Sequence, residues 1–280
     1  METVQELRKE FIADAEANGV GIQSGGYLIE LSLDWIVLRA SENIHHLLGE
    51  SHVTLIDEPL GRFVQAQALH DLRNLFSRLS GTTGIARAYG VRLTDDRALH
   101  DIAFQLSDGR VILEAVPSAS ETFGQAFGSI GGLIASLGDA SGQALLDGGA
   151  RRMRALTGYD RVTLFLGDQR AESSRGAYSA RAERDENLPL LVADSEAATV
   201  AIFPRKSDDT SVSAALMKAS KLDTLRGAEV RSVMRVLFDG GEFRCDGRRP
   251  REPRLEVHAA AELFAQMFAM RMGADRLKNG

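Results

Sequence analysis

Cysteine is almost absent from this chain of 280 residues, which contains only Cys245. A single cysteine excludes an internal disulfide framework and any metal site built from several thiolates. Long hydrophobic runs are also missing, because no stretch approaches the roughly 20 apolar residues that cross a bilayer. The N-terminal stretch METVQELRKEF carries charges where a secretory signal needs an apolar core. We therefore expect a cytoplasmic protein with no membrane segment.

An excess of positive charge is lacking as well. The formal net charge is −6 and the pI is about 5.6, which argues against a dedicated nucleic-acid binder. No Gly-x-Ser-x-Gly elbow, Walker loop, His-Glu-x-x-His motif or kinase signature occurs. We expect no catalytic residues, and an enzyme acting through scattered carboxylates is the weakest of the alternatives.

The six histidines show no metal-ligand spacing. His45 and His46 lie between Glu42 and Glu50, and no second cluster accompanies them. We predict no metal site and expect both histidines at the surface. We also expect a surface position for His258.

Apolar residues make up 44% of the chain, enough for two domains. In the first part we predict a helix over 3–17, a hairpin from YLIEL and WIVLRAS, and two helices, SENIHHLLGE and ALHDLRNLFSRL. Three further strands follow, IARAYGVRL, ALHDIAFQLS and RVILEAVP. Alternation of apolar and polar residues favours antiparallel pairing.

The second part begins with a glycine-rich stretch, 127–158, that keeps helical spacing and predicts one or two helices. We predict a strand over 160–168 with a partner strand at 176–184, and an edge strand over 198–203. A helix over 213–226, a hairpin turning at Asp239-Gly240 and a final helix over 255–278 complete the pattern.

Five segments resemble, in the right order, the PAS–GAF chromophore-binding module of bacterial phytochromes, over residues 18–275. They are GIQSGGYLIEL, ASENIHHLLG, LLDGGARRMRALTGYDRVTLF, EVHAAAELFAQMFAMRM and the stretch 241–258, in which Gly241, Cys245, Pro250 and Arg251 are in register. The resemblance implies an α/β (α+β) fold with an N-terminal helix (1–17), a PAS domain (18–120) and a GAF domain (127–278). Both domains would have antiparallel sheets with flanking helices.

The same resemblance implies a figure-of-eight knot, in which the glycine-rich segment GVGIQSGG threads through a loop of the GAF domain. Gly21 and Gly25 would let two backbones approach closely, since glycine has no side chain. Ile22 would be the apolar plug at the crossing.

The departures from the family concern the pigment. Residues 1–21 lack the biliverdin-attachment cysteine, and no cysteine lies near Lys221. Two family histidines are replaced by Asp246 and Gly247, a tyrosine by Thr224, and a Pro-x-Ser-Asp-Ile-Pro motif has no counterpart between 181 and 213. Buried propionates and pyrrole N–H groups need polar partners, and each one lost costs about 1–3 kcal/mol. We expect no cofactor; non-covalent biliverdin or another tetrapyrrole stays as the alternative.

Cys245 itself is expected to be a buried packing residue, because free cysteines commonly behave as small hydrophobes. A reactive thiol and a ligand are the lesser alternatives. The basic stretch RRPREPR (248–254) is expected to be a solvated loop, the alternative being an anion or acidic-partner site.

These features lead us to expect a non-enzymatic regulatory or adaptor protein that acts through protein contacts in signalling or bilin metabolism. Its partner would be a phytochrome, a histidine kinase or a bilin-metabolism enzyme, and homodimers are expected. The candidate partner or dimer surface is the apolar face of the final helix, formed by Leu263, Phe264, Met267, Phe268 and Met270. The alternative is a small-molecule sensor with a remodelled GAF pocket.

Overall fold

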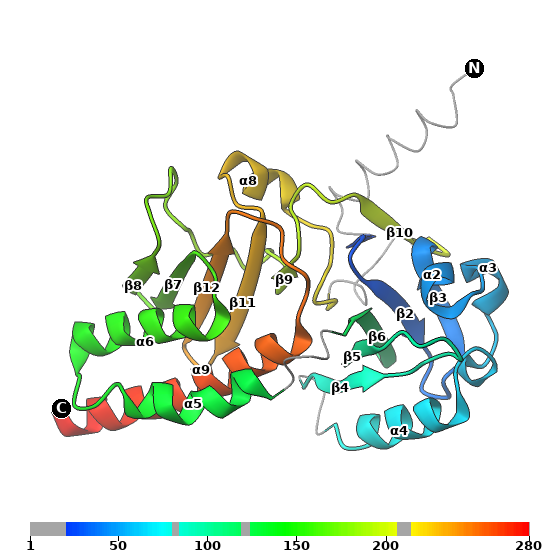
Figure 1. The fold of residues 1–280 in the computed structure, drawn as a ribbon, viewed down its shortest axis with the longest axis horizontal. Helices are drawn as coiled ribbons and strands as arrows, with labels where there is room; N and C mark the ends of the chain where they lie inside the picture. Colours follow the sequence, from blue (N-terminus) through cyan, green and yellow to red (C-terminus); the bar gives the residue numbers. More distant parts are fainter. Residues whose placement is uncertain (1–20, 80–83, 119–123, 206–213, 280) are drawn as a thin grey trace. The chain divides into compact units, whose positions relative to one another are not determined.

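The computed structural model describes residues 21–79, 84–118, 124–205 and 214–279. They form two compact units (Figure 1): one from the described parts of Met1–Ser120 and Glu196–Leu222, the other from those of Glu121–Ser195 and Asp223–Gly280. The helix predicted over 1–17 lies outside the described residues. The described residues of 196–222, which were predicted to belong to the second domain, group with the first unit.

The first unit is built on an antiparallel sheet. Strands β2 (Tyr27–Leu31) and β3 (Val37–Ser41) form the predicted hairpin, and β4 (Ala86–Val91), β5 (His100–Ser107) and β6 (Arg110–Pro117) are the three predicted strands. Helical segments lie between β3 and β4: η1 (Glu42–Ile44), α2 (His45–Leu48), α3 (His52–Leu55), η2 (Leu60–Arg62) and α4 (Ala66–Phe76). The order of hairpin, helices and three strands was predicted from sequence, whereas α3 and η2 were not.

Alternation along the strands decides which residues enter the core of this unit. Ile29, Leu113 and Phe104 come from adjacent strands in register, and all three are buried. α4 adds Ala68 and Leu72, one turn apart on one helix face. Trp35 packs edge-on against Phe104.

Two strands extend this sheet to seven, in the order β1-β10-β3-β2-β6-β5-β4. β1 (Gly21–Gln23) pairs with β10 (Thr199–Phe203), and β10 pairs with β3 on its other side. The prediction of an edge strand at 198–203 is therefore wrong in placement. Its apolar run reflects burial between two neighbouring strands.

The second unit has a five-stranded antiparallel sheet in the order β8-β7-β12-β11-β9. Its strands are β7 (Arg161–Leu166), β8 (Gln169–Ser174), β9 (Leu191–Val192), β11 (Ser232–Phe238) and β12 (Gly241–Gly247). Its helices are α5 (Gln125–Ala135), α6 (Gly142–Thr157), α8 (Leu222–Gly227) and α9 (Leu255–Asn279). α5, α6 and α9 pack against one another in this unit, as Figure 1 shows.

Two predictions for this unit are wrong. Residues 176–184 are not a strand, because β7 pairs with β8 through the tight turn at Gly167. The predicted helix over 213–226 is helical only from Leu222; the described residues before it form turns and contacts with β1. In both cases a tertiary contact overrides the local preference.

The helix-facing side of the second sheet is apolar. Phe243 of β12 packs against Phe264 and Phe268 of α9, with ring centroids 6.1 and 5.5 Å apart. Gly149 of α6 allows close approach here, because a Cβ at that position would lie 2.5 Å from the Phe268 ring. None of the described helices is long and apolar enough to span a bilayer.

Candidate functional site

The other face of the second sheet is charged. Successive residues of a strand point to opposite faces, so Glu242, Arg244 and Asp246 of β12 share one face while Phe243 and Cys245 share the other. All five side chains are buried. Buried charges require partners, so this face depends on a set of ion pairs.

Asp246 is at the centre of this set. Arg161, on neighbouring β7, donates from Nε and Nη2 to Oδ2 of Asp246 at 2.9 and 2.6 Å. Arg244 donates from Nε to Oδ1 at 2.8 Å. The Asp246 side chain is 0% exposed, so two guanidiniums balance one carboxylate away from solvent.

A second pair lies along the same face. Arg235 of β11 binds Glu242 in bidentate geometry, with Nε–Oε1 and Nη2–Oε2 distances of 2.7 and 2.9 Å. Both side chains are almost fully buried. Planar two-point contacts of this kind are among the stronger charge-assisted hydrogen bonds.

Backbone carbonyl groups of the segment 178–188 accept further hydrogen bonds from these arginines. Arg161 donates to the Ala180 carbonyl at 2.7 Å, Arg244 to that of Glu183 at 2.8 Å, and Arg235 to that of Leu188. The Arg161 guanidinium also lies 3.9 Å from the centre of the Tyr178 ring. Tertiary contacts to the arginines thus hold a segment without regular secondary structure.

Cys245 lies on the opposite, helix-facing side. It pairs with Val162 and Met234 across the sheet and is 0% exposed. Burial raises the pKa of its thiol far above the ordinary value, so the nucleophilic thiolate is suppressed. The prediction that Cys245 is a buried packing residue is confirmed.

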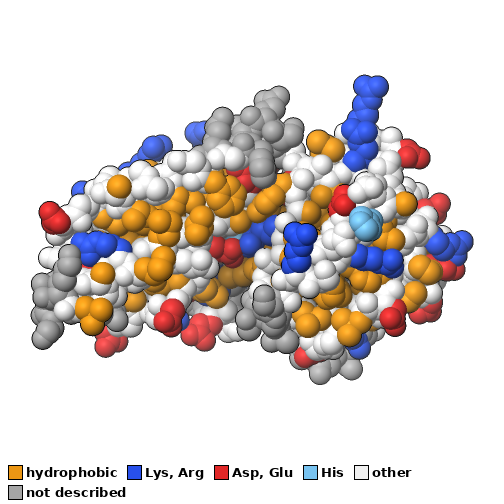
Figure 2. Space-filling view, turned by 90° about the horizontal axis from the view of Figure 1, so that it is seen from below, with side chains coloured by type: hydrophobic (Ala, Val, Ile, Leu, Met, Phe, Trp, Pro, Cys, Tyr) orange, Lys and Arg blue, Asp and Glu red, His pale blue; other side chains and the backbone are white. Residues whose placement is uncertain are grey.

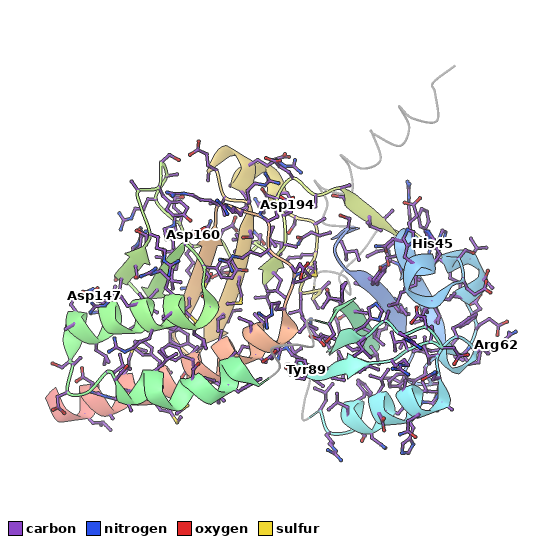
Figure 3. All side chains as sticks on the ribbon, viewed as in Figure 1. His45, Arg62, Tyr89, Asp147, Asp160 and Asp194 are labelled. Carbon is purple, nitrogen blue, oxygen red and sulfur yellow. The ribbon has the colours of Figure 1, made fainter. Side chains whose placement is uncertain are left out.

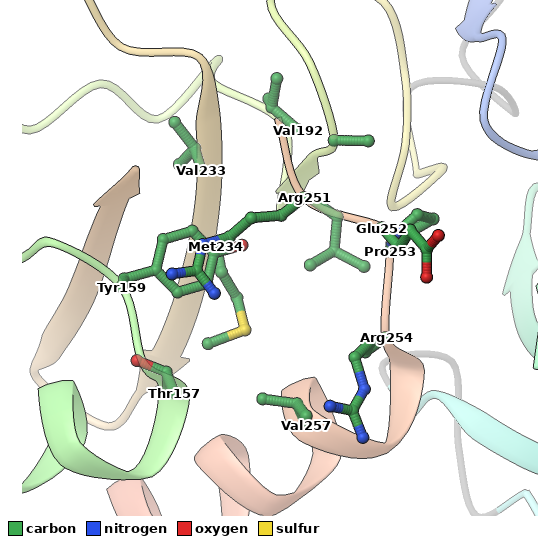
Figure 4. A pocket seen from close by; sticks show the side chains of 12 residues that line it. Thr157, Tyr159, Val192, Val233, Met234, Arg251, Glu252, Pro253, Arg254 and Val257 are labelled. Atoms are coloured by element: carbon green, nitrogen blue, oxygen red, sulfur yellow. The ribbon is translucent and has the colours of Figure 1, made fainter. Parts of the chain in front are cut away.

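A cavity of about 70 Å³ lies near this strand, at the end of α6 and the start of α9 (Figure 4). Thr157, Tyr159 and Met234 form one part of its wall, and Arg251 and Arg254 bring cationic groups to it. The Arg251 guanidinium lies 4.4 Å from the centre of the Tyr159 ring. Arg251 belongs to the predicted solvated loop and is only half-exposed, whereas Arg248 and Arg249 are exposed.

In the first unit, the structure places Gly21 and Ile22 in β1, buried between two parts of the segment 196–222. Gly21 pairs with Ala201 on one side, and its carbonyl accepts from the N–H of Ala219 at 2.8 Å on the other. Ile22 is 1% exposed. Gly25 is exposed in the turn after β1.

Glu114 anchors the same segment. Its two carboxylate oxygens accept from the backbone N–H groups of Leu216 and Met217 at 2.7 and 3.0 Å. Burial raises the pKa of Glu114 to about 7, although both hydrogen bonds and the charge of Arg87 oppose the shift. Glu114 was not predicted as a site residue; its one signal in the sequence is a carboxylate inside the apolar run RVILEAVP.

The five residues of the candidate partner surface lie on two different faces of α9. Phe264 and Phe268 are 0% exposed in the core and are removed from the surface, because α9 uses them to cover the sheet. Leu263 and Met270 are exposed, and Met267 is half-buried. Figure 2 shows hydrophobic side chains gathered over α5 and α9.

The predictions of surface positions for the histidines have different outcomes. His45 and His46 are exposed on α2, as predicted. Figure 3 labels His45. The surface position predicted for His258 is wrong: it is 1% exposed, and its Nε2 lies 3.0 Å from the Arg235 carbonyl. No group of three or more metal-ligating side chains occurs among the described residues.

The charged face was missed from sequence, although a signal was present. GEFRCDG has charges at every second position, a pattern typical of a sheet face in contact with water. Here the face is covered, and the charges of the two neighbouring strands complement those of β12. Complementarity across strands depends on register, which the sequence alone does not give.

Comparison with known proteins agrees with this architecture. Residues 17–118 match a family described as the PAS fold. The chromophore-binding domain of Stigmatella aurantiaca phytochrome P1 is similar in structure, with a TM-score of 0.70, 22% identity, and coverage of 92% of this chain and 96% of that one. The chromophore-binding domain of an unusual bacteriophytochrome from R. palustris gives a TM-score of 0.69 at 20% identity, covering 92% and 96%.

A longer structure, the photosensory core module of the Stigmatella aurantiaca phytochrome, gives a TM-score of 0.72 at 21% identity; the match covers 93% of this chain and 59% of that module. No curated protein sequence matches the chain significantly. Likeness at these identities establishes the fold. The chain therefore has the fold of a phytochrome-like PAS–GAF module.

Proposed function

We propose that this chain is a non-enzymatic, phytochrome-like regulatory or adaptor protein that has lost covalent bilin binding and acts through protein contacts. One observation carries the proposal. Asp246, which replaces a family histidine in the phytochrome resemblance, is buried and held by Arg161 and Arg244. A position expected to serve a pigment is instead part of an internal ion-pair set.

The other substituted positions do not fit a linear tetrapyrrole either. An imidazole at Gly247 would require Ser232 to move, since a Cβ there would lie 2.3 Å from the Ser232 hydroxyl oxygen, which donates to the Arg249 carbonyl at 2.8 Å. Thr224 and Lys221 are exposed. The buried guanidiniums that could meet propionates, Arg161 and Arg235, are already paired with carboxylates. A propionate that took either guanidinium would displace its carboxylate, and removal of one partner from a buried pair costs about 3–5 kcal/mol.

The exposed face of α9 supports the part of the proposal that concerns protein contacts. Leu263, Met267, Met270, Ala274 and Leu277 follow a four–three spacing, which is the seam of a coiled coil. Leu263, Met270 and Leu277 are 41%, 68% and 88% exposed. An open hollow of about 740 Å³ adjoins Met270. This α9 seam is the surface through which we propose homodimers, or pairing with a phytochrome, a histidine kinase or a bilin-metabolism enzyme.

A small-molecule sensor is the second candidate function. The cavity beside Tyr159 favours it, because it combines polar groups with apolar walls. At about 70 Å³ it lies well below the roughly 300–1,000 Å³ of typical drug-sized ligand sites. A bilin would therefore need another site.

Absorbance spectroscopy tests the pigment part of the proposal. The purified protein is mixed with biliverdin and, separately, with haem, and spectra are recorded before and after gel filtration. We expect no visible band to remain with the protein, whereas the chromophore-binding domain of the Stigmatella aurantiaca phytochrome, treated alike, retains biliverdin. A retained far-red band would reject the loss of bilin binding and promote a sensor. Native mass measurement of the same sample tests the proposed homodimer.

A further inference from the structure

Arg251 brings a cationic group to the wall of the cavity between the end of α6 and the start of α9. Arg251 lines it, and the structure gives Arg251 no ion pair with any described carboxylate. Its contacts are the Tyr159 ring, 4.4 Å from the guanidinium, and the Gly158 carbonyl. Several of its N–H donors thus remain available at the cavity wall.

Tyr159 adds a second, independent polar group. Its side chain is 7% exposed, and its hydroxyl forms no hydrogen bond with any of the described residues. A hydroxyl that lines a cavity and has no protein partner is open to a hydrogen bond with a water or a ligand in that cavity. Burial also raises the pKa of Tyr159 well above its ordinary value, so the group stays a neutral donor.

The rest of the wall sets the size and polarity of an occupant. Val192, Val233, Met234 and Val257 are apolar. The volume of about 70 Å³ is several times the roughly 10–15 Å³ that one water needs. The carboxylate of Glu252 points away from Tyr159 in Figure 4, and Arg254 lies 3.7 Å from its own partner, Glu256.

We propose that this cavity binds a small monoanion with a short apolar tail, such as a short-chain carboxylate. Arg251 would bind the carboxylate, the Tyr159 hydroxyl would donate to it, and the valines and Met234 would cover the tail. The lining of the site includes neither Arg161 nor Asp246. It is therefore independent of the proposed loss of bilin binding.

Isothermal titration calorimetry with butyrate tests the site on the full chain, and butyramide is the neutral analogue of the same shape. We expect saturable binding of butyrate and none of butyramide at the same concentration. Arg251→Met should weaken butyrate binding at least about tenfold, the loss expected for a charge-assisted hydrogen bond. Tyr159→Phe, which keeps the ring under Arg251, should weaken it about two- to tenfold.

Arg249→Met is the matched control, since Arg249 is an exposed arginine on the same segment outside the cavity. It should bind butyrate as the unmodified chain does. The proposal is overturned if butyrate does not bind, if butyramide binds equally well, or if Arg249→Met weakens binding as much as Arg251→Met. Circular dichroism spectra of each variant establish that a lost signal is not due to unfolding.

Discussion

Arg161 and Asp246 are neighbours across β7 and β12, and two nitrogens of the guanidinium meet one carboxylate oxygen at 2.9 and 2.6 Å. Arg244 occupies the other oxygen. A buried ion pair of this kind adds little net stability compared with apolar residues, but removal of one partner leaves an uncompensated charge.

Asp246→Asn should therefore lower the free energy of unfolding by about 3–5 kcal/mol, because Arg161 and Arg244 both lose their buried counter-charge. Urea denaturation followed by circular dichroism measures the change. Glu172→Gln serves as the control, because the side chains of Glu172 and its partner Arg170 are 35% and 18% exposed. The free energy of unfolding should fall by less than about 1 kcal/mol in this variant. Equal losses in the two variants would contradict the role assigned to Asp246.

Glu114 should make stability depend on pH. Its pKa is raised by burial to about 7 in the folded chain, against an ordinary value of 4.5, so folding takes up a proton between these pH values. The stabilisation is fully present below pH 4.5 and is lost as pH rises towards 7, with a slope of up to about 1.4 kcal/mol per pH unit.

Glu114→Gln should flatten this slope between pH 4.5 and 7, since glutamine does not titrate. Denaturant midpoints measured across the range give the slope directly. Glu58→Gln removes an exposed carboxylate paired with Arg62 and should keep the unmodified slope. A Glu114→Gln slope equal to that of the unmodified chain would count against a raised pKa at this position.

Gly21 should not tolerate a side chain. A Cβ there would lie 2.5 Å from the Thr199 methyl carbon and 2.8 Å from the Val200 carbonyl oxygen. Gly21→Ala should therefore cost about 1–3 kcal/mol through overpacking between β1 and β10. Thermal unfolding measures this cost.

Gly128→Ala is the comparison for Gly21. Gly128 lies within α5 with nothing inside 4 Å of the added Cβ. Alanine is favoured over glycine in a helix by about 0.5–1 kcal/mol, so this variant should be neutral or more stable. A neutral Gly21→Ala variant would mean that the close approach of the two strands is not needed.

The α9 seam should control self-association. Leu263→Glu combined with Met270→Glu places charges in an apolar contact and should shift the native mass from dimer to monomer. Light scattering after size exclusion gives the mass. Leu33→Glu makes the same change at a leucine that is 58% exposed in the first unit, and it should leave the mass unaltered. A monomeric unmodified chain would reject homodimers.

The sequence predicted the features that depend on local pattern. Alternation of apolar and polar residues predicted the β2–β3 hairpin and the β5–β6 pair. Glycines predicted the ends of α2 and α6 and the turn between β11 and β12. Five short motifs in order then gave the two-domain fold. These signals survive because a strand or helix face needs only a periodic apolar set.

Tertiary structure decided the rest. The run ATVAIF was predicted as an edge strand, yet β10 lies between β1 and β3 of the first unit. In the pairing of β1 with β10, Ile22 lies opposite Val200, which is some 180 residues later in the sequence. His258 reads as a surface residue because its helix begins beside a basic loop, but the chain folds it against the Arg235 carbonyl. The charges of GEFRCDG reveal a polar face, whereas only the register of β7 and β11 shows that Arg161 and Arg235 neutralise it. A local pattern records which side chains share a face, and long-range pairing determines what that face meets.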